Sequence, residues 1–119
     1  SLYNFVKNKD LKSEGSSITE GIGTSRITKN FENTLVDYAY RIDDTKALNV
    51  IFNLLKHEGL CLGTSSGINV AGAIEMAKEM GPGNTIVTIL CDVGSRSASK
   101  IFNVDFLKSK NLPYPDWLV

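Results

Sequence analysis

The chain has 119 residues, the size of one small domain, and 42% of them are hydrophobic, as in globular rather than disordered proteins. Its 13 basic and 13 acidic residues cancel, so nothing in the composition indicates a basic surface and we expect no nucleic-acid partner. The apolar runs are only a few residues long, far short of the roughly 20 residues that a membrane span needs.

The first predicted elements in chain order are a short helix, a long loop and a strand. The helix is expected over residues 2–8. Residues 13–30 are rich in Gly, Ser and Thr and are predicted to form a long loop, a kind of segment that is often functional. Residues 34–42 alternate between apolar and polar side chains, which is the period of a half-buried strand.

A helix, a short strand and a second helix come next. Asp43–Thr45 offers capping residues, apolar side chains then recur at helical spacing, and Gly59 is the expected end of the helix. Leu60–Leu62 is predicted to be a short strand, and the second helix follows the segment Gly63–Gly67. Gly81–Asn84 has the composition of a turn.

The last predicted strand covers residues 85–91, a continuous apolar run typical of a strand buried on both faces of a parallel sheet. Helices are expected over residues 95–103 and 104–110. The alternation of strands and helices predicts one α/β domain with a parallel sheet over residues 1–119. Such sheets bind ligands beyond the carboxyl ends of their strands.

Two glycine-rich segments are candidate ligand sites. Gly63–Gly67 opens a predicted helix, where free N–H groups and the helix dipole favour a phosphate or a carboxylate. The alternative is that Ser65 or Ser66 caps the helix and the glycines allow close packing. No lysine follows the second glycine, so the segment is not a P-loop. Gly21–Gly23 also permits close approach of a ligand to the backbone, but one Gly-x-Gly is a weak signal.

Cys61 and Cys91 each lie within an apolar stretch. Free cysteines are among the most buried residues, so we expect two reduced thiols in the core of a cytoplasmic protein. A disulfide, a metal site and a nucleophile are the alternatives, and no metal site is predicted. The first residues are mixed and polar, without the pattern of a secretory signal.

Three stretches together resemble one family. The stretches EGIGTSRIT, EGLCLGTSSGINVAGAIEMA and GPGNTIVTILCDVGSR, the last followed by SASKIFN, have the order and spacing of the C-terminal part of the cysteine synthases. These belong to the fold-type-II pyridoxal-phosphate (PLP) enzymes, as does cystathionine β-synthase. The resemblance covers essentially all 119 residues, including the ending PYPDWL. It implies the three-layer parallel-sheet large domain of a tryptophan synthase β-like enzyme, of which this chain would be the last third.

The resemblance also implies a function. The family makes L-cysteine and acetate from O-acetyl-L-serine and sulfide by PLP-dependent β-replacement. A cytoplasmic homodimer or other homo-oligomer, and serine acetyltransferase as a partner, are further expectations. The lysine that bonds PLP in the family would lie before Ser1. We therefore assign no catalytic residue, and we expect the chain alone to be inactive and not to retain PLP.

One wall of the cofactor site is implied within this chain. A Gly-Ile-Gly loop lies beside the cofactor in the family, and a strand end that commonly reads Asp-Ser-Gly places its serine hydroxyl on the pyridine nitrogen. The matching residues are Gly21, Ile22, Gly23, Asp92, Val93 and Gly94. Val93 replaces the serine and has no side-chain donor or acceptor. Ser97 replaces an aromatic residue that is common after the family's arginine.

Val93 leaves several interpretations open. The protein belongs to a branch that varies at this position, or it is impaired, or it has another role. The intact remainder of the motifs favours the first. The alternatives in function are a cystathionine β-synthase-type β-replacement and a non-catalytic binding module that docks a partner through the former active-site cleft.

Overall fold

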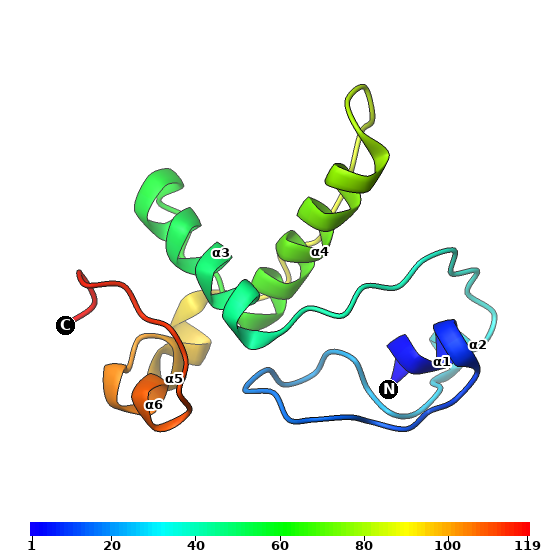
Figure 1. Ribbon diagram of the computed structural model, residues 1–119, viewed down its shortest axis with the longest axis horizontal. Coiled ribbons are helices and arrows are strands. Elements are labelled where there is room, and N and C mark those ends of the chain that lie inside the picture. The colour runs from blue at the N-terminus through cyan, green and yellow to red at the C-terminus, as the bar shows by residue number, and fades with distance from the viewer.

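A computed structural model describes residues 1–119, and it contains helices but no strand. Its elements are α1 (Leu2–Asn8), α2 (Lys29–Glu32), α3 (Asp44–Glu58), α4 (Thr64–Met80), the 3-10 helix η1 (Gly94–Ser97), α5 (Ala98–Ile101) and α6 (Val104–Ser109). The two long helices α3 and α4 diverge from a common base, with α5 and α6 beside that base and α1 and α2 set apart (Figure 1). No helix is both long enough and apolar enough to cross a bilayer.

Local signals determine the bounds of α3. The Asp43 side chain accepts a hydrogen bond from the Lys46 N–H at 2.8 Å, and Gly59 closes the helix with its own N–H on Leu54. The predicted caps at both ends are therefore confirmed, because each depends only on residues within a few positions of the helix end. The predicted helix over residues 2–8 is confirmed as α1.

The core lies where α3 meets the C-terminal helices. Leu48, Ile51 and Phe52 of α3 pack with Ile101 of α5 and Leu107 of α6. The Phe52 ring also meets the Trp117 ring edge-on, with centroids 5.9 Å apart. Only 13 of the 119 residues are buried, and large apolar side chains such as Leu35, Val87 and Ile89 are exposed.

The contact between α3 and α4 depends on Gly67. A Cβ atom at Gly67 would lie 2.6 Å from Ile51 Cγ1 and 3.0 Å from the Ala47 carbonyl oxygen. Any side chain there would therefore separate the two helices near their N-terminal ends, where they approach each other (Figure 1).

None of the three predicted strands forms a strand here. Residues 35–42 and 85–91 make no backbone–backbone hydrogen bond, and Leu60–Leu62 contributes a single antiparallel bridge, from Leu62 to Val93. A strand needs a neighbouring strand to accept and donate its ladder bonds, and these 119 residues supply none. The parallel sheet stays a prediction.

Three smaller expectations are corrected. The Gly63–Gly67 segment is the first turn of α4 rather than a loop before it, and the helix expected over residues 95–103 divides into η1 and α5. Cys61 and Cys91 are free but exposed, so the expected burial of both thiols is wrong for this chain. Both lie on segments that have no covering element here.

Candidate functional site

Asp92 holds the N-terminus of α4. Its carboxylate accepts hydrogen bonds from the backbone N–H groups of Ser65 at 3.1 Å and Ser66 at 2.7 Å, and from the Ser66 hydroxyl at 2.6 Å. The first N–H groups of a helix have no partner within it, and the helix dipole favours a negative charge there. The anion at the Gly63–Gly67 segment is thus a carboxylate of the chain itself, and neither serine side chain caps the helix.

The backbone around Asp92 is fixed as well. The Asp92 carbonyl accepts from the Gly63 N–H at 3.1 Å, and the Gly94 N–H donates to the Cys61 carbonyl at 3.0 Å. The Ser66 hydroxyl, fully buried, also accepts from the Asp92 N–H at 3.0 Å. A side chain at Gly63 would collide with the Asp92 carboxylate. The end of the 85–91 segment is therefore locked to the start of α4.

A cavity of about 540 Å³ opens beside this lock, and we call it the Asp92 cavity. Its walls come from the loop before α2, the start of α4 and the η1–α5 region, and include Gly21, Ser65, Arg96 and Lys100. Lys100 pairs with Glu20 at 2.5 Å, whereas Arg96 makes no ion pair. The Arg96 guanidinium is the one unpaired cation on the cavity wall.

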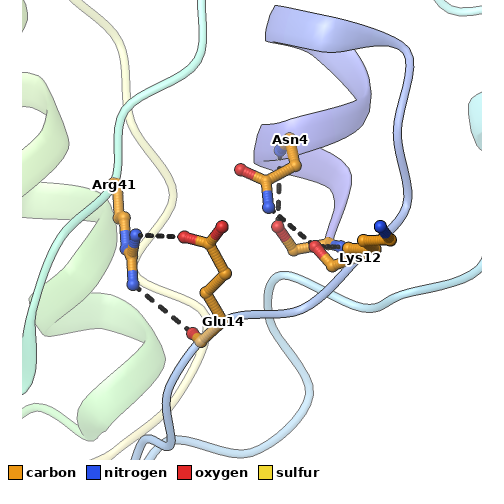
Figure 2. A network of polar contacts seen from close by, with 5 residues as sticks. Asn4, Lys12, Glu14 and Arg41 are labelled. Carbon is orange, nitrogen blue, oxygen red and sulfur yellow. Dashed lines mark hydrogen bonds and ion pairs between the residues drawn. The ribbon is translucent and has the colours of Figure 1, made fainter.

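Polar contacts anchor the long loop that carries Gly21–Gly23. Glu14 extends from the loop toward Arg41, whose guanidinium donates to the Glu14 carboxylate at 3.2 Å and to its carbonyl at 3.4 Å (Figure 2). Asn4 of α1 donates its side-chain amide to the Lys12 carbonyl at 2.7 Å (Figure 2). The loop is thus ordered although it has no regular secondary structure.

Gly21 and Gly23 both have left-handed backbone conformations, with φ of 79° and 68°. No heavy atom lies within 4 Å of a Cβ built on either residue, so the space on that side of each glycine is open. Glycine is needed here for conformation, and the open space beside it leaves room for another molecule to reach the peptide groups.

A second cavity, of about 370 Å³, is lined by Ile22 and Gly23 of the loop, and we call it the Tyr40 cavity. Tyr40, Asn69 and Gly23 are among its lining residues. Thr19 also lines it, and the buried Thr19 hydroxyl has no hydrogen-bond partner. An unpartnered buried hydroxyl favours a polar neighbour at this position.

The structure brings together some of the six predicted cofactor residues. Gly21 and Asp92 line the Asp92 cavity, Ile22 and Gly23 line the Tyr40 cavity, and Val93 and Gly94 line neither. The Val93 side chain is 53% exposed, whereas Gly94 is buried where a Cβ would lie 2.6 Å from Cys61 Sγ. The Asp92 carboxylate is engaged with α4, which makes its contribution one of positioning.

Sequence reasoning placed Ser65 and Arg96 near a possible ligand site but missed Glu20 and Lys100 as residues of this region. Glu20 immediately precedes the Gly21–Gly23 loop and is linked to both Ser65 and Lys100. The only available signal was the position of basic residues just after the predicted strand end at 91. Charge alone could not indicate that Lys100 would pair with Glu20, which lies 80 positions away in the sequence.

Comparison with known proteins places the chain in a family. The family model described as pyridoxal-phosphate dependent enzyme matches residues 1–92. Cysteine synthase 2 of Schizosaccharomyces pombe is 46% identical over 81% of this chain and 25% of its own length. Cysteine synthase 1 of Neurospora crassa is 45% identical over 87% of this chain and 28% of its own length. Cystathionine beta-synthase of Dictyostelium discoideum is 34% identical over 82% of this chain and 20% of its own length.

The chain thus spans about a quarter of the length of the curated relatives that it matches. The matches cover the Gly21–Gly23 loop, the start of α4 and the 85–91 segment up to Asp92. On this basis the chain belongs to the pyridoxal-phosphate-dependent enzyme family.

Proposed function

We propose that the whole protein carrying this chain is a PLP-dependent cysteine synthase. It would convert O-acetyl-L-serine and sulfide into L-cysteine and acetate, breaking the bond from the β-carbon to the acetate oxygen and forming a carbon–sulfur bond. The observation that carries this proposal is the 45–46% identity to cysteine synthases over more than four-fifths of the chain. Identity to the cystathionine beta-synthase is lower, at 34%.

The residues present fit a PLP cofactor on one side. PLP is a flat ring with an anionic phosphate, and binding sites of ligands this size have volumes of roughly 300–1,000 Å³. The Asp92 cavity is within that range, offers the unpaired Arg96 to an anion, and is flanked by the open backbone of Gly21–Gly23. Lys100 is the lysine on its wall, and it is paired with Glu20. We therefore propose that this chain supplies one wall of the site and no catalytic residue.

Each residue of that wall has a proposed task. PLP, when bound, supplies an electron sink for the amino-acid substrate. The backbone of Gly21–Gly23, with Ile22 between the glycines, would lie against the cofactor. Asp92, through its hydrogen bonds to the start of α4, would fix the position of Val93 and Gly94 relative to the cofactor. Val93 cannot donate to or accept from the ring nitrogen, so a water molecule or another group would take that place.

The remaining expectations are proposals of the same kind. A parallel sheet would form when residues 35–42 and 85–91, which have free backbone groups here, find neighbouring strands. Self-association is supported by exposed apolar side chains such as Leu35 at 95% and Val87 at 88%. A cytoplasmic location and serine acetyltransferase as a partner rest on the family resemblance alone.

A second candidate function is a cystathionine β-synthase-type replacement, in which homocysteine takes the place of sulfide. The similarity to the Dictyostelium enzyme supports it. A non-catalytic binding module is supported by Val93, because the side chain has lost the polar group that the family places there. The three candidates differ in whether PLP binds and in which nucleophile is used.

One assay separates them. The purified whole protein is supplied with PLP and O-acetylserine, and then with either sulfide or homocysteine. The proposal predicts cysteine at a much higher rate than cystathionine, and no cysteine from the 119-residue chain alone. Cystathionine as the main product would establish the second candidate. Failure to bind PLP at all would leave the binding module.

A further inference from the structure

Glu20, directly before the Gly21–Gly23 loop, is held from two sides. Its carboxylate pairs with Lys100 Nζ at 2.5 Å, and its backbone carbonyl accepts from the Ser65 hydroxyl at 3.2 Å. Ser65 belongs to the first turn of α4 and Lys100 to α5. The first turn of α4, which Asp92 also holds, and α5 therefore both fix the residue before the glycine loop.

The segment before Glu20 is fastened too. The Ser17 hydroxyl and the Ile18 N–H both donate to the Asp44 carboxylate, at 2.6 and 3.0 Å. Asp44 is the first residue of α3. Residues 17–20 are thus attached to the N-terminal turns of both long helices and to α5.

The loop itself makes no hydrogen bond. Gly21, Ile22 and Gly23 neither donate nor accept one, and the next anchor is the Thr24 carbonyl, which accepts from Leu2 at 2.9 Å. The space at the Cβ positions of both glycines is open, with no neighbour within 4 Å, while the half-buried Ile22 between them lines the Tyr40 cavity. The hydrogen bonds nearest to this backbone are therefore those at its two ends, at Glu20 and at Thr24.

We propose that Lys100 and Ser65 are positioning residues, which hold Glu20 so that the backbone of the Gly21–Gly23 loop is presented to the cofactor in a single conformation. We call the contacts of Lys100 and Ser65 with Glu20 the clamp. The inference rests on the proposed function for the identity of the ligand, and on these contacts for the clamp itself. The hydrogen bond and the charge of Lys100 lower the pKa of Glu20 below its ordinary value of 4.5.

The structure offers a matched control. Lys46 pairs with Glu75 at 3.1 Å between α3 and α4, in an exposed ion pair that does not touch the loop. Lys46→Gln removes one surface ion pair and one positive charge, as Lys100→Gln does. An effect that appears only in Lys100→Gln therefore belongs to the clamp and not to the change in net charge.

The test uses the whole protein labelled with ¹⁵N-glycine, without PLP, and measures backbone order parameters by NMR. In the unchanged protein we expect Gly21 and Gly23 to be near the rigid value of about 0.85, and in Lys100→Gln to fall below about 0.6. Ser65→Ala, which removes the hydrogen bond to the Glu20 carbonyl, should also lower the order parameters of Gly21 and Gly23. The charge swap of Glu20→Lys with Lys100→Glu should restore them. Unchanged order parameters in both Lys100→Gln and Ser65→Ala, or an equal fall in Lys46→Gln, would overturn the proposal.

A second readout connects the clamp to the ligand. We expect the PLP dissociation constant to rise about two- to fivefold in Lys100→Gln, the range that an exposed ion pair supports. The effect should shrink in high salt, which screens exposed charges. If Lys100→Gln has the same PLP dissociation constant as the unchanged protein, the clamp does not help the loop to bind PLP, and that part of the proposal is refuted. If no variant binds PLP, the proposed function fails, while the order parameters still decide whether the clamp exists.

Discussion

Asp92 and Ser66, 26 residues apart, exchange hydrogen bonds in both directions. The Asp92 N–H donates to the Ser66 hydroxyl, and the Ser66 N–H and hydroxyl lie 2.7 and 2.6 Å from the Asp92 carboxylate. The pair joins the end of the 85–91 segment to the first turn of α4. Val93 and Gly94 follow directly, so the position of the predicted cofactor wall depends on this pair.

Removing the Ser66 hydroxyl should destabilise the fold. Ser66→Ala leaves the part-buried Asp92 N–H without its acceptor, and a donor left unpaired in this way typically costs about 1–3 kcal/mol. Ser65→Ala is the control, because the Ser65 side chain contacts Glu20 and only its backbone contacts Asp92. Urea unfolding of both variants should show the larger loss in Ser66→Ala. A Ser66→Ala variant as stable as the unchanged protein would mean that the Ser66 hydroxyl contributes nothing to the contact with Asp92.

Two glycines of α4 should respond to alanine in opposite directions. Gly67→Ala places a methyl group against Ile51 and the Ala47 carbonyl, and overpacking of this kind costs about 1–3 kcal/mol. Gly72→Ala meets no atom within 4 Å, so it should stabilise the helix by roughly 0.5–1 kcal/mol. Thermal unfolding of the two variants checks the pair. A stabilised Gly67→Ala would contradict the close crossing of α3 and α4.

The pKa of Tyr40 is raised to about 12, chiefly because its hydroxyl donates to the Glu79 carboxylate at 2.7 Å. Because this pKa is above the ordinary value of 10.0, the hydrogen bond from Tyr40 to Glu79 stabilises the folded chain below pH 10. That stabilisation is lost as the pH rises through about 12. Glu79→Gln should return the pKa toward 10.0, and Glu75→Gln should lower it much less. Titration of the tyrosine Cζ signals by ¹³C NMR, assigned with Tyr40→Phe, decides this. A pKa still near 12 in Glu79→Gln would contradict the assigned cause.

The chain by itself should associate. Val87 and Ile89 are 88% and 70% exposed on a segment whose backbone N–H and C=O groups have no backbone partner. Exposed apolar side chains beside an unpaired edge are a ready surface for a second chain. Val87→Lys with Ile89→Lys should shift sedimentation toward the monomer, whereas Asn53→Lys on the exposed side of α3 should not. A dilution-resistant monomer of the unchanged chain would refute the expectation.

The features that sequence reasoning predicted correctly depend on neighbours in the chain. The caps Asp43 and Gly59 define α3 because each acts on residues a few positions away. The strands are different, since pairing is a property of two segments and residues 85–91 have no partner strand here. The candidate site likewise contains residues that the sequence indicated and residues that it did not. The sequence indicated that Gly21 and Asp92 belong to one region, but the Glu20–Lys100 pair spans 80 positions and left no local signal.

The most direct test of the central claim, that the end of the 85–91 segment faces the PLP ring, is a comparison of PLP dissociation constants in the whole protein. Val93 is the position that the family resemblance places at the ring nitrogen, and its side chain is half exposed. Val93→Ser restores a hydroxyl, and a hydrogen bond of the usual net strength should tighten PLP binding about threefold to tenfold. Val93→Thr, which keeps the branched shape, should do the same.

Val93→Ile is the matched control and should give no gain, because it adds bulk without a donor or acceptor. The four proteins are titrated with PLP and followed by the absorbance of the bound cofactor. The account predicts tighter binding in the serine and threonine variants alone. If all three substitutions leave the dissociation constant unchanged, Val93 does not face the ring, and the assignment of Asp92, Val93 and Gly94 to the cofactor site is wrong.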